Sequence, residues 1–137
     1  MGRIGTAVAR KASYGFGMKV LGYRRNLPGD ICADYGILTS DLDKVIRNSD
    51  FLSIHLPYTK DTFHLVSCEK LELMKPDAYL LNLGRGEVVD QAALRELLLS
   101  NRLAGAALDV FEGEILDADD PLLHMDQVIA TPHIAGL

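Results

Sequence analysis

The sequence lacks several features that would place it in well-defined classes of protein. Its two cysteines, Cys32 and Cys68, stand far apart and match no CxxC or zinc-ligand spacing. Reduced thiols in a cytoplasmic protein are therefore the favoured interpretation. No apolar run approaches the length of a membrane span, and the first residues lack the layout of a secretory signal. The four histidines show no spacing such as HExxH, so no metal site is predicted.

Positive charge is also scarce. Lys and Arg number 14 against 19 Asp and Glu, which gives a formal net charge of -5. Nucleic acids and anionic membranes are bound by clustered Lys and Arg, so neither is an expected partner. A local basic pair could still hold the phosphate of a small ligand. The length of 137 residues, with 48% hydrophobic and 24% charged residues, is typical of one soluble domain.

Short apolar runs alternate with segments of helical period along the whole chain. Helices are expected over 4–14, 40–48, 67–74 and 90–101, and strands over 18–23, 51–56, 78–83, 105–111 and 128–130. This alternation predicts an α/β fold, a doubly wound parallel sheet covered on both faces, in one domain over residues 1–137. Ligands bind such sheets outside the carboxyl ends of the strands. Functional residues are therefore sought directly after each strand.

The chain opens with two glycines before the first helix. Gly2 and Gly5 fit the second and third glycines of a GxGxxG dinucleotide fingerprint. The second lets the backbone approach a pyrophosphate, and the helix N-terminus then faces its negative charge. The first glycine and its strand are not in the sequence, so we expect a fold that is incomplete at the N-terminus, with unpaired edges on the two neighbouring strands. A flexible terminus would also explain the glycines.

Arg24 and Arg25 directly follow the predicted strand 18–23. A dinucleotide fold usually places an acid here, which accepts the ribose 2′-hydroxyl. A guanidinium instead matches a 2′-phosphate, so the pair predicts a preference for NADP. A solvated basic pair in a loop is an equally good interpretation from position alone.

Two further strand ends carry charged residues. Arg85 stands between Gly84 and Gly86, where it can reach into a cleft and grip a carboxylate. The alternative is a surface arginine in a turn. Asp109 lies in an apolar strand, where an unpaired charge is costly, so it should have a partner such as the nicotinamide ribose or ring.

His133 follows the last strand. A lone histidine is more often structural than catalytic, but beside a carboxylate it can act as an acid–base catalyst. Both Asp and Glu residues are available, and Glu112 and Glu114 follow Asp109 closely.

These motifs together resemble the D-isomer-specific 2-hydroxyacid dehydrogenases, with a Rossmann-like dinucleotide-binding domain, over essentially the entire chain. The resemblance rests on Gly2-Arg3-Ile4-Gly5, His55-Leu56-Pro57 with Thr59 and Thr62, the stretches 82–86, 89–90 and 105–114, and Thr131 through Gly136. It implies that Arg85, Glu114 and His133 are catalytic. It implies cofactor contacts at Arg3, Ile4, Leu56, Pro57, Thr62, Leu83, Arg85 and Asp109. Gly2, Gly5, Arg24, Arg25 and His133 complete the predicted cofactor site.

The activity that the resemblance implies is the NAD(P)-dependent interconversion of a 2-oxoacid and a D-2-hydroxyacid, of glyoxylate/hydroxypyruvate, phosphoglycerate or lactate type. Arg85 would hold the carboxylate, His133 would donate the proton and Glu114 would orient His133. Relatives add a substrate domain and commonly dimerise through this one, so the chain alone is expected to be inactive and its parent a homodimer. A non-catalytic dinucleotide-binding fragment or a corepressor-like sensor is the alternative.

Overall fold

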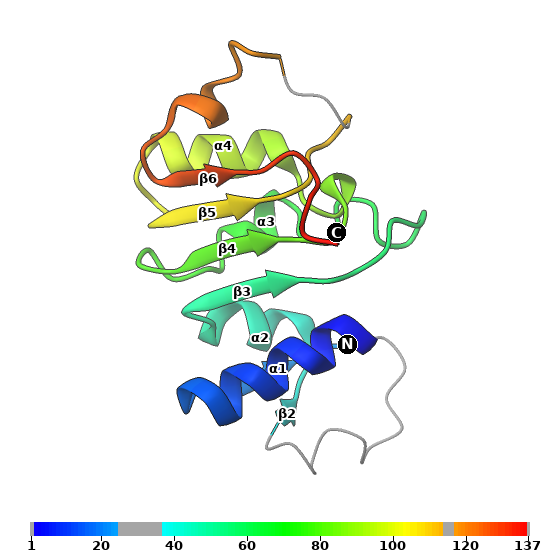
Figure 1. Cartoon of the computed structure of the whole chain (residues 1–137). Helices are drawn as coiled ribbons and strands as arrows, with labels where there is room; N and C mark the ends of the chain where they lie inside the picture. Colours follow the sequence, from blue (N-terminus) through cyan, green and yellow to red (C-terminus); the bar gives the residue numbers. More distant parts are fainter. Residues whose placement is uncertain (1, 25–36, 114–116, 137) are drawn as a thin grey trace.

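A computed structural model describes residues 2–24, 37–113 and 117–136 of the chain. Helices and strands alternate along it, and every strand pair is parallel, which confirms the predicted α/β fold (Figure 1). The elements are, in order, α1 (Arg3–Phe16), β1 (Val20–Gly22), β2 (Ile37–Thr39), α2 (Leu42–Asn48), β3 (Phe51–Ile54), α3 (Cys68–Leu71), β4 (Tyr79–Asn82), the 3-10 turn η2 (Gly86–Val88), α4 (Gln91–Leu99), β5 (Gly105–Leu108), the 3-10 turn η3 (Pro121–His124) and β6 (Val128–Ala130).

The strands form two sheets. One holds β1 and β2, and the other holds β3, β4, β5 and β6 in that order. Among the described strands, β1 pairs only with β2, and β3 pairs only with β4 and not with β1, in agreement with the expected unpaired edges. Strand β2 was not predicted, because its three residues show no alternation and no proline follows them, whereas Pro132 marks the end of the equally short β6.

Aspartates begin two of the helices. Asp41 accepts a hydrogen bond from the backbone N–H of Lys44 at 2.8 Å, and Asp90 accepts one from Ala93 at 3.0 Å. Each satisfies a donor that the first helical turn leaves without a partner. The start predicted at Asp90 is confirmed, whereas α2 begins after Asp41 and not at Ser40.

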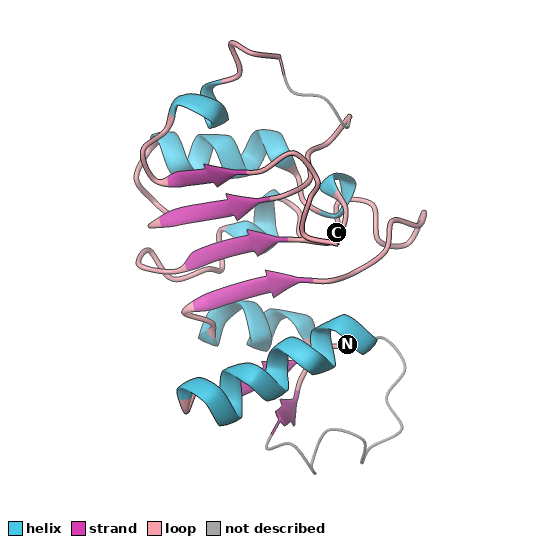
Figure 2. Cartoon of the chain, viewed as in Figure 1, coloured by secondary structure: helices cyan, strands magenta, loops and turns pink. Residues whose placement is uncertain are grey.

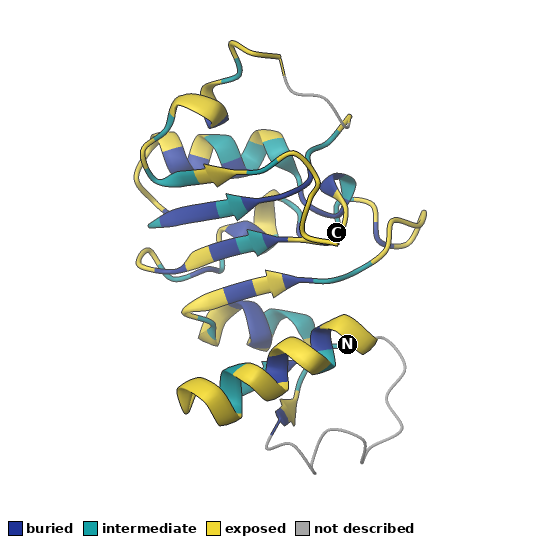
Figure 3. Ribbon diagram, in the orientation of Figure 1, coloured by how far each residue is buried: buried dark blue, intermediate teal, exposed yellow. Residues whose placement is uncertain are grey.

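One face of the four-stranded sheet carries the main core. Leu52, Leu80 and Leu108 are buried, and the residues beside Leu52 and Leu80 in their strands are exposed or half-buried. They belong to the same hydrophobic cluster as Ile46 of α2 and Leu94 of α4. Figures 2 and 3 show these helices behind the sheet, with buried residues on the sides that meet it. Each fully buried Leu or Ile stabilises the fold by roughly 1.5–3 kcal/mol.

The opposite face of β3–β6 is open in the described structure. Phe51 and Tyr79 stack there with ring centroids 5.5 Å apart, yet remain 55% and 44% exposed. Ile129 of β6 is 67% exposed. Figure 1 shows α1 on the near side, beside β2, and α2, α3 and α4 on the far side. Helices thus lie on both sides of the molecule, as the doubly wound fold predicts, while Phe51, Tyr79 and Ile129 on this face of β3–β6 remain exposed.

The strands end earlier than their sequence pattern predicts. β3 ends at Ile54 and not at residue 56, β4 at Asn82 and not at 83, and β5 at Leu108 and not at 111. Helix α3 is likewise shorter than predicted and ends at Leu71. The residues between the observed and the predicted ends of these strands are apolar or charged loop residues, and they form part of the candidate site. No described helix is both long enough and apolar enough to span a bilayer.

Candidate active site at the carboxyl ends of the strands

The loops that carry the predicted site residues gather at one edge of the molecule. The arrowheads of β3 to β6 point to the same side, and both chain ends lie on that side (Figure 1). The first turn of α1, with Gly2 and Gly5, is therefore on the same side as the loops after β3, β4, β5 and β6. This placement agrees with the expectation drawn from a parallel sheet.

A buried asparagine holds the turn that presents Arg85. Asn82 is 1% exposed. Its amide nitrogen donates to the Arg85 carbonyl at 3.0 Å, and its amide oxygen accepts the Gly84 N–H at 3.1 Å. Both polar atoms of the side chain are thus committed to the turn. Asn82 was predicted only as part of the motif 82–86 and was given no role, although a polar residue at the end of an apolar strand is a usable signal.

The glycines on either side of Arg85 are required by close backbone contacts. A Cβ on Gly84 would lie 2.7 Å from the Leu56 carbonyl oxygen, and one on Gly86 would lie 2.0 Å from that of Phe111. The crowded backbone predicted around Arg85 is confirmed. Arg85 itself is exposed, donates to the Gly84 carbonyl at 2.7 Å, and forms no ion pair with a described carboxylate. Its charge is available to an anion from outside.

Asp109 fastens the segment that carries His133. It is 2% exposed, and its carboxylate accepts the Thr131 hydroxyl at 2.5 Å and the N–H groups of Ile134 and Ala135 at 2.9 Å each. Burial by itself would raise the pKa of this carboxyl, but these hydrogen bonds and the nearby His133 outweigh burial and lower it. The expectation that Asp109 has a partner is confirmed, and the partner is the chain itself. Its contact with a cofactor stays a prediction.

His133 has an unusual backbone. Its φ is +55°, a left-handed conformation that costs energy in a residue other than glycine. Its N–H donates to the Asp109 carbonyl at 3.0 Å and to the Thr131 carbonyl at 3.1 Å. The residue is exposed. Because Asp109 N–H in turn donates to the Asn82 carbonyl at 3.0 Å, Arg85 and His133 stand on one continuous network of hydrogen bonds.

The loop after β3 is folded around Thr62. This residue is 4% exposed, and its hydroxyl donates to the Pro57 carbonyl at 2.8 Å and accepts the Thr59 N–H at 2.7 Å. Leu56, just before the loop, lies against Gly84. Thr62 thus stabilises the fold of the loop through its own hydrogen bonds, and its role as a cofactor contact stays a prediction. Leu83 is 38% exposed, and its contact with a cofactor also stays a prediction.

The amino-terminal candidates lie on α1 and at the end of β1. Gly5 is buried, as close packing of the helix requires, whereas Arg3 and Ile4 are exposed. Nothing described lies within 4 Å of a Cβ built on Gly2. Arg24 is exposed directly after β1. Arg25 and Glu114 lie outside the described residues.

His55, at the end of β3, is partly buried. Its Nε2 lies 2.8 Å from the Ser53 hydroxyl, and its Nδ1 is buried without a hydrogen-bond partner among the described residues. Burial lowers the pKa of His55, so the ring is neutral near pH 7. The described residues contain no cluster of three or more His, Cys, Asp or Glu that could hold a metal ion.

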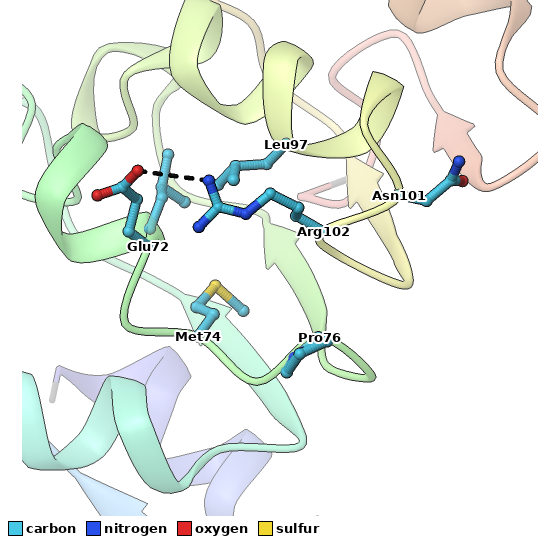
Figure 4. A pocket seen from close by; sticks show the side chains of 7 residues that line it. Glu72, Met74, Pro76, Leu97, Asn101 and Arg102 are labelled. Carbon is cyan, nitrogen blue, oxygen red and sulfur yellow. Dashed lines mark hydrogen bonds and ion pairs between the residues drawn. The ribbon is translucent and has the colours of Figure 1, made fainter.

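A cavity of about 220 Å³ lies elsewhere. Figure 4 shows it between the α3 and α4 regions, with the ion pair of Glu72 and Arg102 at 3.5 Å and with Met74 and Pro76. Met74 and Pro76 precede β4, and Arg102 precedes β5, so the cavity is at the amino ends of the strands. None of its lining residues is among the predicted site residues.

A parallel α/β sheet with a glycine-started helix and charged loops at the carboxyl ends of its strands defines a dinucleotide-binding domain. The sequence profile of the NAD-binding domain of D-isomer-specific 2-hydroxyacid dehydrogenases matches residues 1–135. The chain belongs to that family.

Individual relatives agree with this assignment. Glyoxylate/hydroxypyruvate reductase B of Pectobacterium carotovorum is 48% identical over 136 residues, which are 99% of this chain and 42% of that protein. A Xanthobacter autotrophicus Py2 family member in complex with NADPH and MES matches with a TM-score of 0.89 at 34% identity, over 97% of this chain and 55% of that one. An NAD-complexed member from Lactobacillus delbrueckii ssp. bulgaricus matches with a TM-score of 0.86 at 34% identity, over 96% and 43%. The chain thus spans about two-fifths of the length of the curated relative it matches.

Proposed function

We propose that the chain is the cofactor-binding part of an enzyme that reduces small 2-oxoacids to D-2-hydroxyacids with NADPH or NADH. The observation that carries this proposal is the hydrogen-bond network through Asn82 and Asp109, which supports Arg85 and His133 together. One cation for a carboxylate and one acid–base group for a carbonyl oxygen are what this reaction needs.

The residues at the start of the chain fit a dinucleotide. The first turn of α1 offers backbone N–H groups and the positive end of a 14-residue helix to a pyrophosphate. No described atom lies within 4 Å of a Cβ built on Gly2, so a bound phosphate could come close to its backbone. The exposed guanidinium of Arg24 suits a 2′-phosphate, which favours NADPH over NADH.

Arg85, His133 and Glu114 would each have a separate role in the reaction. A nicotinamide cofactor bound by this chain would supply the hydride for reduction of the keto carbon. Arg85 binds the substrate carboxylate and stabilises negative charge as it develops on the carbonyl oxygen. His133 gives its proton to that oxygen, which becomes the hydroxyl group, and Glu114 keeps the imidazole protonated and oriented. We further propose that the full-length enzyme is a homodimer and that the chain alone does not turn over.

A chimaera tests the proposal. This chain replaces the matched 136 residues of the Pectobacterium carotovorum reductase, and NADPH oxidation is followed at 340 nm with glyoxylate, hydroxypyruvate and pyruvate. We expect turnover that Arg85→Ala reduces about a hundredfold or more, because a charge-stabilising group is lost. Arg85→Lys is the matched control, since it keeps the charge but not the bidentate fork.

The result also separates the two functions considered. A chimaera that binds NADPH but reduces none of the three acids would contradict the proposed activity. Binding without turnover is what a dinucleotide sensor would show, and it would favour the non-catalytic alternative.

A further inference from the structure

His64 has a strained backbone that the proposed mechanism does not use. Its φ is +45°, one of three positive values among the described residues other than glycine. Such conformations persist where surrounding contacts hold them, and they concentrate at functional sites. The residue lies in the loop after β3, two positions beyond the buried Thr62.

Contacts with two other loops hold His64 in place. Its backbone N–H donates to the Glu87 carbonyl at 2.8 Å, in the turn η2 that follows Arg85. Its Nε2 lies 3.0 Å from Glu112 Oε1, in the loop after β5. The ring also stacks on Phe63 at 4.0 Å between centroids. One residue thus connects the loops after three neighbouring strands.

The partner carboxylate is itself fixed next to the Arg85 turn. The Glu112 backbone N–H donates to Gln91 Oε1 at 2.9 Å, at the start of α4. A Cβ on Gly86 would lie 2.4 Å from the Glu112 nitrogen, so the backbones at Gly86 and Glu112 are in direct contact. The side chains of His64 and Glu112 are 30% and 34% exposed, which leaves their bond partly shielded from water.

We propose that His64 and Glu112 form a latch that sets the position of Arg85, by holding the loop after β3 and the loop after β5 on either side of the Arg85 turn. Both are positioning residues and neither needs to touch substrate or cofactor. The inference rests on the proposed function only for its effect on turnover. The junction of the three loops itself can be tested on the chain without any ligand.

The first experiment measures turnover in the chimaera with glyoxylate. His64→Gly removes the ring while keeping a residue suited to the left-handed backbone, and Glu112→Ala removes the carboxylate. We expect each change to lower kcat for glyoxylate about tenfold through misplacement of Arg85, with the KM for NADPH unchanged. The double variant should be no worse than the worse single one, because the two side chains act as a unit. Glu112→Gln should retain most activity, since its amide oxygen still accepts a hydrogen bond.

The second experiment follows amide hydrogen exchange in the unliganded chain. In Glu112→Ala, exchange at the amides of His64 and residues 86–88 should accelerate. Glu72→Ala is the matched control, because it breaks an ion pair with Arg102 at the opposite end of the strands. It should leave those amides unchanged.

The outcomes distinguish the latch from the proposed activity. An unsubstituted chimaera that reduces no 2-oxoacid contradicts the proposed function, and hydrogen exchange then decides the latch alone. Additive losses in the double variant, an unchanged kcat in either single variant, or exchange unaffected by Glu112→Ala would each overturn the latch.

Discussion

The molecule has a small amino-terminal part, which consists of α1, β1 and β2, and a larger part, which runs from α2 to β6. The two parts differ greatly in how much apolar surface they bury. The cluster that includes β3, β4 and β5 contains eighteen buried hydrophobic residues, whereas the cluster of α1 and β2 contains two, Ala9 and Ile37. Helix α1 also leaves large side chains in water, with Tyr14 and Phe16 68% and 78% exposed. Burial of apolar surface is the main stabilising term in folding, so most of the stability resides in the larger part.

The two parts also carry different halves of the proposed reaction. The phosphate-binding candidates Gly2 and Arg24 are in the amino-terminal part, while Arg85 and His133 stand on the buried network of the larger part. Changes that destabilise the amino-terminal part should therefore weaken cofactor binding. Changes that destabilise the larger part should displace Arg85 and His133.

The largest expected effect is on the core of the larger part. Leu80 is fully buried in β4, and Leu80→Ala should cost about 2–5 kcal/mol by lost burial and cavity formation. Ile37→Ala, in β2, should cost less, because the structure around it is sparsely packed and can relax. Urea unfolding followed by circular dichroism measures both. Equal costs would contradict the asymmetry between the two parts.

The next effect concerns the buried carboxylate of Asp109. Asp109→Asn should destabilise the larger part by roughly 1.5–3 kcal/mol, since it weakens charge-assisted hydrogen bonds to the His133 segment. Thr131→Val removes one of these bonds and serves as a milder companion. If thermal unfolding of Asp109→Asn matches that of the unsubstituted chain, the carboxylate does not hold this segment.

Acid should destabilise the protein in two windows. The pKa of His55 is lowered by burial, so the unfolded chain binds its proton more readily, and stability is lost as the pH falls below the ordinary value of 6.5. The pKa of Asp109 is also lowered, so its contribution is complete above 3.8 and is lost as the pH falls through its lower folded value. The free energy of unfolding should be measured across pH for both variants. His55→Gln should lack the loss below pH 6.5, and Asp109→Asn should lack the loss below pH 3.8. If the free energy of unfolding of His55→Gln still falls below pH 6.5 as steeply as that of the unsubstituted chain, His55 does not cause the loss of stability in that range.

In the amino-terminal part, Arg24 should decide which dinucleotide is preferred. Arg24→Asp should shift the ratio of the NADPH and NADH dissociation constants about tenfold to hundredfold towards NADH, because a charge-assisted contact contributes roughly 1.5–3 kcal/mol. Isothermal titration of the chimaera with each dinucleotide measures the ratio. An unchanged ratio would mean that Arg24 is a solvated surface residue.

The comparison of the two parts also explains what sequence reasoning could find. The order of helices and strands, the parallel sheet and the crowded turn at Arg85 followed from periodicity and from glycine spacing, which are local properties. Strand β2 and the exposed residues on one face of β3–β6 did not, because β2 is short and has no proline to mark its end, and exposure depends on what packs against the sheet. The partner of Asp109 was likewise out of reach, since Thr131 and Ala135 are more than twenty residues away and meet it only through the pairing of β5 with β6.

The smallest expected effect compares two glycines of the amino-terminal part. Gly2 is the N-cap of α1 without a side-chain bond, and Gly15 lies inside the helix. Nothing described is within 4 Å of a Cβ built on either. Gly15→Ala should stabilise α1 by about 0.5–1 kcal/mol and leave NADPH binding intact. Gly2→Ser should stabilise it by only a few tenths of a kcal/mol through capping.

Only one of the two changes should affect NADPH binding. The side chain introduced by Gly2→Ser would occupy the space into which we place the pyrophosphate, so this change should weaken binding of NADPH to the chain while the urea midpoint rises slightly. Gly15→Ala, at the far end of the same helix, should raise the midpoint and not weaken binding. Stability and affinity that rise together in Gly2→Ser would mean that the space at Gly2 is surface and that the dinucleotide lies elsewhere.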